Sequence, residues 1–307
     1  MKTFWQALFL FGVGAALAAP AWAAEQPLNV VTTLSSFADL AEQVGGDRVK
    51  TRYIASPRFN PHFIEPRPSD VLKVKRADLF IHAGLDLELW RWPLVDAAGN
   101  PEVRHGGPRE LDLSTGVRLL EVPDRAVTRA EGDIHLYGNP HYWLDPENLK
   151  TMARSIAGKL SQLDPSHAAG YERRLKQFLA QLEGKITEWK QIASGLRGKE
   201  AVAYHNEWPY LTEFLGMKVE QFLEPKPGIP PTPKQLAFLG GYMKAHNVPV
   251  IIQGTFVPRA AGERLAKETG ARLVVLCQNV KEKPECSDAV TMLDHNIRTL
   301  AKAFGNG

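Results

Sequence analysis

The stretch AAGYERRLKQFLAQLEGKITEWKQIASGL, residues 168–196, carries apolar side chains three or four positions apart over its whole length. This spacing places them on one face of an α-helix, and only Gly184 weakens the pattern. At 1.5 Å per residue the helix is ~40–45 Å long, more than the width of one small domain. A coiled-coil arm would fit this length, but a strut between two lobes fits better because α/β patterns lie on both sides of it. The apolar face consists of Tyr171, Leu175, Phe178, Leu179, Leu182, Ile186, Trp189 and Ile192.

Before the long helix, short β-branched runs alternate with helical patterns. We predict strands at residues 28–33, 49–55 and 78–84, with helices at 36–44 and 68–77 between them. The third run, DLFIHAG, is almost continuously apolar, as expected of a strand buried in a parallel sheet. The alternation therefore indicates an α/β unit.

The connection from this unit to the long helix has a different composition. Residues 90–137 are poorly periodic and rich in proline and glycine, so we expect loops there, with one short strand around residues 117–120. Residues 148–163 have a helical pattern that leads into the long helix.

After the long helix the α/β alternation starts again. We therefore predict an α/β fold of two lobes with parallel-type sheets, joined by one long backbone helix. Open α/β sheets bind ligands at the carboxyl ends of their strands, which places the expected site in the cleft between the lobes. The expected division is an N-terminal lobe at 24–165, the connecting helix at 166–197 and a C-terminal lobe at 198–307. The second lobe's predicted strands are residues 201–205, 217–223, 248–254 and 271–276, and its helices are 207–214, 233–245, 260–268 and 287–304.

The first residues have the pattern of an export signal. Met1-Lys2 precedes an apolar run at residues 7–19, and Ala21-Trp22-Ala23 resembles a signal-peptidase site. We predict a secretory signal peptide at residues 1–23, cleaved after Ala23. A retained membrane anchor is the alternative, but the run is shorter than the ~20 residues that a spanning helix needs. The mature protein is expected to be exported to the periplasm.

Charge does not indicate a polyanionic partner. The chain has 37 basic and 34 acidic residues, and removing the signal peptide takes away only Lys2. Both signs are interspersed, with no basic tract or aromatic-basic array, so we expect no nucleic-acid binding. The expected protein is a monomer.

The two cysteines, Cys277 and Cys286, lie close together near the C-terminus. In an exported chain a short-loop disulfide is favoured over free thiols or metal ligands.

Three of the nine histidines stand at junctions where a cleft site would find its ligands. His62 lies in NPHFIEPRPSD, after the second strand; His141 lies in GNPHYWLDP, just before a helix start; and His205 directly follows the strand AVAY. A single histidine is more often structural, but three neutral imidazoles suit zinc or another borderline divalent metal. His135, six residues before His141, is a weaker candidate for an outer or recruiting ligand.

Six segments of the chain are distinctive when they occur together: TTLSSFADLAEQVGGDRV, NPHFIEPRPSD, RADLFIHAGLDLELW, GNPHYWLDPENL, AYHNEWPYLTEFLGMK and RLAKETGARLVVL. With them the chain resembles the metal-binding receptors of bacterial zinc and manganese ABC importers over residues 28–303. The resemblance implies two α/β lobes bridged by a long helix, a metal in the cleft, and His62, His141 and His205 as ligands.

The fourth ligand position departs from the family pattern. Where relatives commonly have Glu or Asp at the end of a strand, VIIQGTFVPRAA places Gln253. The fourth ligand is then Gln253, water or a loop residue. Three histidines without a carboxylate favour zinc over manganese, because manganese prefers hard oxygen ligands.

The resulting hypothesis is an exported substrate-binding protein that captures zinc and delivers it to the membrane permease of an ABC transporter. Because the imidazoles must be neutral to bind, zinc affinity is expected to fall below pH ~6. One alternative is a zinc hydrolase with Glu65 or Glu207 as general base, although no HExxH motif is present. The other is an adhesin-like surface protein with an incidental metal.

Overall fold

The computed structural model describes residues 26–124, 135–226 and 228–305. The predicted signal peptide, residues 1–23, lies outside them. Within the described ranges, no helix combines the length and the apolar character needed to cross a bilayer.

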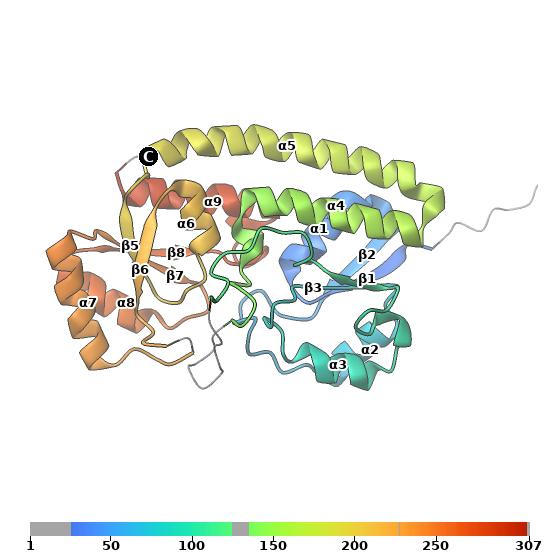
Figure 1. The fold of residues 1–307 in the computed structure, drawn as a ribbon, viewed down its shortest axis with the longest axis horizontal. Coiled ribbons are helices and arrows are strands. Elements are labelled where there is room, and N and C mark those ends of the chain that lie inside the picture. Colours follow the sequence, from blue (N-terminus) through green and yellow to red (C-terminus); the bar gives the residue numbers. More distant parts are fainter. Residues whose placement is uncertain (1–25, 125–134, 227, 306–307) are drawn as a thin grey trace, which may run out of the picture.

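Two parallel four-stranded sheets repeat one topology (Figure 1). The first has the strand order β2-β1-β3-β4 and the second the order β6-β5-β7-β8. In each sheet the strand that comes first in the chain, β1 or β5, lies between the next two strands. The direction of the strand order reverses there, and open α/β sheets have a crevice at the carboxyl ends of the strands at such a point. The predicted α/β class with parallel sheets is confirmed. The strands are β1 (Leu28–Thr32), β2 (Val49–Tyr53), β3 (Leu79–His82), β4 (Glu110–Asp112), β5 (Glu200–Ala203), β6 (Lys218–Phe222), β7 (Val250–Gly254) and β8 (Arg272–Leu276).

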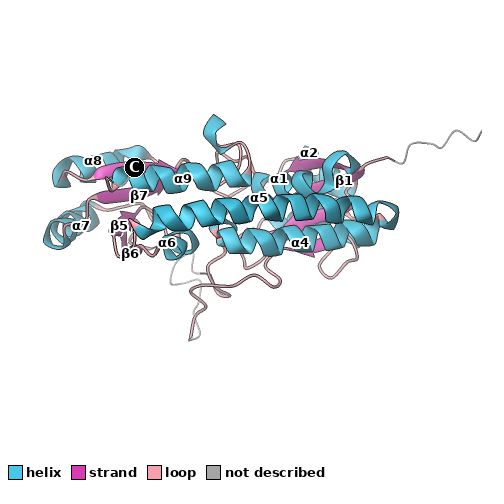
Figure 2. Cartoon of the chain, turned by 90° about the horizontal axis from the view of Figure 1, so that it is seen from above, coloured by secondary structure: helices cyan, strands magenta, loops and turns pink. Residues whose placement is uncertain are grey.

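The long helix α5 (Ala168–Ser194) runs across the top of both sheets in Figure 1. Seen from above, it lies over α4 (Pro146–Leu163) at one end and beside α9 (Ala289–Ala303) at the other (Figure 2). The indole Nε1 of Trp189 on α5 donates to Asp294 Oδ1 of α9 at 2.9 Å. The predicted strut therefore exists. The remaining α-helices are α1 (Ser35–Gly45), α2 (Pro68–Lys75), α3 (Arg91–Ala98), α6 (Pro209–Leu215), α7 (Pro233–His246) and α8 (Arg259–Thr269).

One hydrophobic core extends through both lobes. It includes Val30 and Phe80 of the first sheet, Trp189 of α5, and Ile252 of the second sheet, all fully buried. A smaller cluster between the second sheet and the helices α7 and α8 is centred on residues such as Ile251. Because the main core is shared, the wall behind the cleft is a continuous packed layer.

The loop after β8 connects the lobes by hydrogen bonds. Its Val280 carbonyl accepts from Ser35 Oγ at the start of α1 (2.7 Å), and its Gln278 carbonyl accepts from Trp143 Nε1 (2.8 Å). The Cys277–Cys286 disulfide closes this loop, as predicted.

The connection between the first sheet and α4 differs from its prediction. The strand expected at residues 117–120 is wrong: Leu120 donates its N–H to the Tyr210 hydroxyl and accepts from the Asn139 N–H, so the segment joins no ladder. The fourth strand is instead β4, a three-residue edge strand paired with β3. Helix α3 was not predicted, because Pro93 in its first turn and Gly99 at its end resemble loop signals.

Candidate metal centre

The His62 loop follows β2 and is held at two points. The backbone N–H of His62 donates to Asn60 Oδ1 at 3.0 Å, a local turn contact. The indole of Trp90, from the start of α3, donates to the Pro61 carbonyl at 2.8 Å. Both bonds hold the peptide group between Pro61 and His62, immediately before the residue that carries the ring.

His141 lies between a rigid turn and the start of α4. Asp145 caps α4 by accepting from the Glu147 N–H at 2.8 Å, and Pro146 occupies the first helical position. Asn139 Oδ1 accepts from both the backbone N–H (3.0 Å) and the ring Nδ1 (2.9 Å) of His141. A proton on Nδ1 leaves the lone pair on Nε2 for a metal.

His205 comes two residues after the end of β5, at the point where the order of the second sheet reverses. Its Nδ1 lies 2.7 Å from Glu224 Oε2, an atom that also accepts from the Gly228 N–H at 3.1 Å. A carboxylate only accepts hydrogen bonds, so this contact also directs the proton to Nδ1. The Nε2 of His205 is buried and makes no hydrogen bond.

The rings of His62, His141 and His205 converge. The Nε2 atoms of His62 and His141 are 3.3 Å apart. Ligand atoms that bind a tetrahedral zinc ion at ~2.0–2.1 Å lie ~3.3–3.4 Å from one another, so this pair has the spacing of two zinc ligands. The ring of His205 lies 5.8 Å, centroid to centroid, from each of the other two.

His135 joins these rings, although its sequence position made it only a weak candidate. Its ring stacks on His62 at 5.1 Å and lies 5.8 Å from His141. Ligand atoms of His62, His135 and His141 all lie within 4.8 Å of one another, a group to which His205 does not belong. The Nε2 of His135 is buried, and no residue that the structure describes forms a hydrogen bond with it.

Burial keeps these imidazoles neutral. Burial and the neighbouring rings lower the pKa of His62 and of His141 well below the ordinary value of 6.5. Burial, with His205 nearby, lowers the pKa of His135 to about 3. Neutral rings carry the lone pairs that a metal requires.

Gln253 lies at the end of β7 but faces helix α8. Its Oε1 is so close to Gly262 that a Cβ there would be 2.5 Å away. Among the described residues, neither buried amide atom of Gln253 has a hydrogen-bond partner. Gln253 as the fourth ligand stays a prediction.

Glu207 is not placed as a general base for water. Its side chain is fully buried, and Gln278 Nε2 donates to its Oε2 at 3.1 Å. Burial, with the carboxylates of Glu282 and Glu224 nearby, raises the pKa of Glu207 well above its ordinary value. The other candidate base, Glu65, is exposed.

Two residues that hold the rings were not identified from the sequence. Asn139 precedes His141 by two positions, so the motif NPH itself contains the signal. Glu224, by contrast, reaches His205 only through the packing of β6 beside β5. No local pattern identifies it.

Comparison with known proteins gives consistent relatives. The family model described as zinc-uptake complex component A, periplasmic (ZnuA), matches residues 30–303. The high-affinity zinc uptake system protein ZnuA of Bacillus subtilis is 27% identical over 81% of this chain and 77% of its own length. A manganese ABC transporter substrate-binding lipoprotein of Streptococcus gordonii is 25% identical over 90% and 89%.

Solved structures share the fold. A crystal structure of ZnuA aligns with a TM-score of 0.77 at 24% identity, covering 91% of this chain and 100% of the other. The laminin-binding adhesin of Streptococcus agalactiae aligns with a TM-score of 0.75 at 26% identity, covering 90% and 99%.

The matching family consists of substrate-binding proteins for metal transport, so the zinc-hydrolase alternative is discarded. The chain belongs to the ZnuA family, the metal-binding substrate-binding proteins of ABC importers.

Proposed function

We propose that this protein captures a zinc ion with His62, His135, His141 and His205 and delivers it to the permease of an ABC importer. The observation that carries the proposal is the composition of the site. Among the residues that the structure describes, four imidazoles converge, and no carboxylate belongs to the group of ligand atoms within 4.8 Å of one another. The relatives are named for zinc, manganese or iron, so the ligands of this chain must decide between these ions.

The ligand set favours zinc over manganese on two grounds. Affinity of a nitrogen site rises from Mn²⁺ through Fe²⁺ towards Zn²⁺, and manganese prefers carboxylate and carbonyl oxygens in an octahedral shell. The Nε2 spacing of 3.3 Å between His62 and His141 suits the short bonds of a tetrahedral zinc site.

Export to the periplasm is part of the proposal. It is supported by the predicted signal peptide at 1–23 and by the periplasmic description of the family, and several relatives are lipoproteins by name. We retain the division into a lobe at 24–165, a connecting helix at 166–197 and a lobe at 198–307.

The permease is proposed to dock on an apolar rim around the cleft, formed by Phe59, Phe63, Val122, Tyr137 and Ile229. Their exposure is 60%, 62%, 58%, 58% and 48%. Phe63 and Tyr137 lie one and two residues from His62 and His135, and the ideal Cβ of Gly228, beside Ile229, is 3.5 Å from Phe63. Phe63 and Tyr137 are therefore close in sequence to two of the proposed ligands, where a receiver of the ion would make contact.

Rim and site can be tested separately. Phe59→Ser should abolish zinc-dependent growth while leaving zinc affinity unchanged. Phe238→Ser, which changes a phenylalanine of similar exposure (54%) on α7, is the matched control and should support growth. Normal growth with Phe59→Ser would contradict docking at the rim.

The metal assignment is tested by titrating metal-free protein with zinc and with manganese at pH 7.5. We expect one zinc per chain, bound at least a hundredfold more tightly than manganese. Absence of zinc binding, or equal affinities for the two ions, would refute the proposed substrate.

An adhesin role is a second candidate, because a laminin-binding adhesin has this fold. The two roles separate on deletion of the gene. Loss of the receptor should stop growth when zinc is scarce, whereas loss of an adhesin should leave growth unchanged and reduce attachment to laminin.

A further inference from the structure

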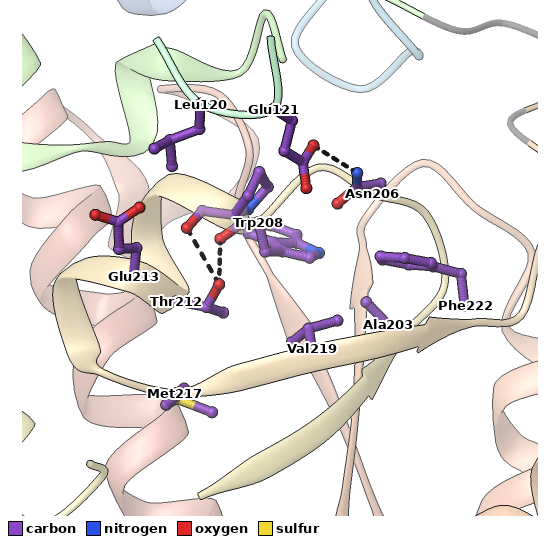
Figure 3. A pocket seen from close by; sticks show the side chains of 11 residues that line it. Leu120, Glu121, Ala203, Asn206, Trp208, Thr212, Glu213, Met217, Val219 and Phe222 are labelled. Atoms are coloured by element: carbon purple, nitrogen blue, oxygen red, sulfur yellow. Dashed lines mark hydrogen bonds between the residues drawn. The ribbon is translucent and has the colours of Figure 1, made fainter. Parts of the chain in front are cut away.

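One carboxylate connects the two loops that carry His141 and His205. Glu121 Oε2 accepts from Asn139 Nδ2 at 2.9 Å and from Asn206 Nδ2 at 2.7 Å. Figure 3 shows the bond to Asn206 at the edge of a cavity. The same oxygen of Glu121 thus accepts hydrogen bonds from one residue near His141 and from one residue next to His205.

The two asparagines are also bonded to each other. Asn139 Nδ2 donates to the backbone carbonyl of Asn206 at 2.9 Å. Asn206 directly follows His205, and Asn139 holds both the backbone and the ring of His141. The contacts therefore form a closed triangle, with one corner on each histidine loop and the third at Glu121.

This triangle determines which way the Asn139 amide points. Its Nδ2 faces a carboxylate and a carbonyl, and both groups only accept hydrogen bonds. The amide must therefore keep its NH₂ on that side and its Oδ1 toward His141. Because Oδ1 only accepts, the ring proton of His141 must reside on Nδ1, and Nε2 keeps its lone pair.

The backbone holds Glu121 in a conformation that its residue type disfavours. Glu121 has φ +53°, in the left-handed region. The residue before it is fixed at both backbone atoms, since the Leu120 N–H donates to Tyr210 Oη (3.0 Å) and its carbonyl accepts from the Asn139 N–H (2.8 Å). Such local strain is often found where a side chain must be aimed at a functional site.

We propose that Glu121 is a positioning residue for metal binding: it fixes the Asn139 amide, and through it the His141 tautomer, and it sets the separation of the His141 and His205 loops. The inference rests on the proposed metal-binding function, and no described contact brings Glu121 to a histidine ring.

The surroundings of Glu121 allow a clean test. It lines a cavity of about 380 Å³ together with Trp208, Thr212 and Glu213, and its side chain is exposed, so truncation removes no core packing. Glu213 is the matched control, because it is an exposed carboxylate on the same cavity that pairs with Arg118 and touches neither asparagine.

The first measurement is zinc affinity and the rate of zinc release to a chelator. Glu121→Ala should weaken zinc binding about tenfold and speed release, the usual effect of losing a partner behind a metal ligand. Glu121→Gln can still offer an amide oxygen to both asparagines and should restore binding to within about threefold of wild type. Glu213→Gln should bind as wild type does.

The second measurement needs no metal. Long-range ¹H–¹⁵N NMR of the metal-free protein should show His141 protonated on Nδ1 in wild type and in Glu213→Gln. In Glu121→Ala, where only the Asn206 carbonyl still accepts from Asn139 Nδ2, the share of His141 protonated on Nε2 should rise. The inference is overturned if Glu121→Ala binds zinc as wild type does, if Glu213→Gln is equally impaired, or if the tautomers are unchanged. Failure of wild type to bind zinc would instead refute the proposed function, and the NMR result would still judge Glu121.

Discussion

The two sides of the metal centre are built differently. The chain before α5 supplies His62, His135 and His141, whose ligand atoms already lie within 4.8 Å of one another. The chain after α5 supplies only His205, which stands outside this group and is held by Glu224. The first side is therefore an assembled binding surface, and the second is a single ligand whose approach completes the shell.

This difference suggests a sequence for capture. An ion that enters the cleft can bind the three preassembled rings first, and a small movement of the His205 loop then closes the site. The shared core and the hydrogen bonds between Ser35, Trp143 and the loop after β8 oppose a wide hinge motion. Loop movement is the less costly route.

The largest loss of zinc affinity should come from replacing His141, one of the three proposed ligands before α5. His141 contacts the rings of all three other histidines. A structural zinc site is worth roughly 10–16 kcal/mol in all, or about 3 kcal/mol per ligand, so His141→Ala should weaken zinc binding by about a hundredfold or more. Calorimetric titration of metal-free protein measures this loss. Wild-type affinity in this variant would contradict the whole site.

Replacing His205, the proposed ligand after α5, should reduce zinc affinity less. His205→Ala leaves the preassembled rings, and water can take the fourth position of zinc, so we expect a loss of about ten- to thirtyfold. Competition with a chromophoric chelator would compare it with His141→Ala under the same conditions. If His205→Ala proved the more damaging, the assembled side would not be the primary binding surface.

The partner behind His205 should have a smaller effect still. Glu224→Gln can keep a hydrogen bond to Nδ1 but loses the charge, and should weaken zinc binding about tenfold or somewhat less. The release rate measured by stopped flow should rise by the same factor. A normal release rate would show that Glu224 does not orient the ring.

Acid should destabilise the metal-free protein because the folded state holds His135 unprotonated. Burial lowers the pKa of His135 from 6.5 to about 3, so below pH 6.5 the unfolded chain binds more protons than the folded one. Stability should therefore fall as the pH drops from 6.5 toward 3. Melting temperatures from pH 7 to pH 4 measure the fall, which should be shallower in His135→Ala. An identical pH dependence in both proteins would refute this cause.

The same pKa shifts alter the expected pH range of binding. Free imidazoles would lose zinc below pH ~6, but the buried rings stay neutral in more acidic solution. Zinc should therefore be retained below pH 6 for as long as the fold persists.

The smallest change in zinc affinity should come from replacing Gln253. Its amide faces Gly262 and makes no hydrogen bond, so Gln253→Leu should leave zinc affinity within about twofold of wild type. Replacing an unpaired buried amide by an apolar group of similar size should also leave stability unchanged or slightly raised. A large loss of zinc affinity would instead support Gln253 as a ligand.

The sequence alone was sufficient for the elements whose signals are local. Apolar periodicity predicted α5, which was expected at 168–196 and observed at Ala168–Ser194, and β-branched runs predicted the parallel strands. Edge strand β4 and short helix α3 were not predicted. Strand β4 has only three residues, which pair with β3, and α3 has a proline in its first turn, so neither shows a periodic apolar pattern.

For the metal site, the sequence by itself determined which histidines stand at the ends of strands or before helices, since turn residues and helix starts are local features. His62, His141 and His205 were identified in this way. Only the tertiary structure decided that His135 joins them, that Gln253 faces α8, that Glu224 contacts the His205 ring, and that Glu121 binds the asparagines of the His141 and His205 loops. These contacts join segments far apart in the chain, and their distances depend on how the strands, loops and helices pack.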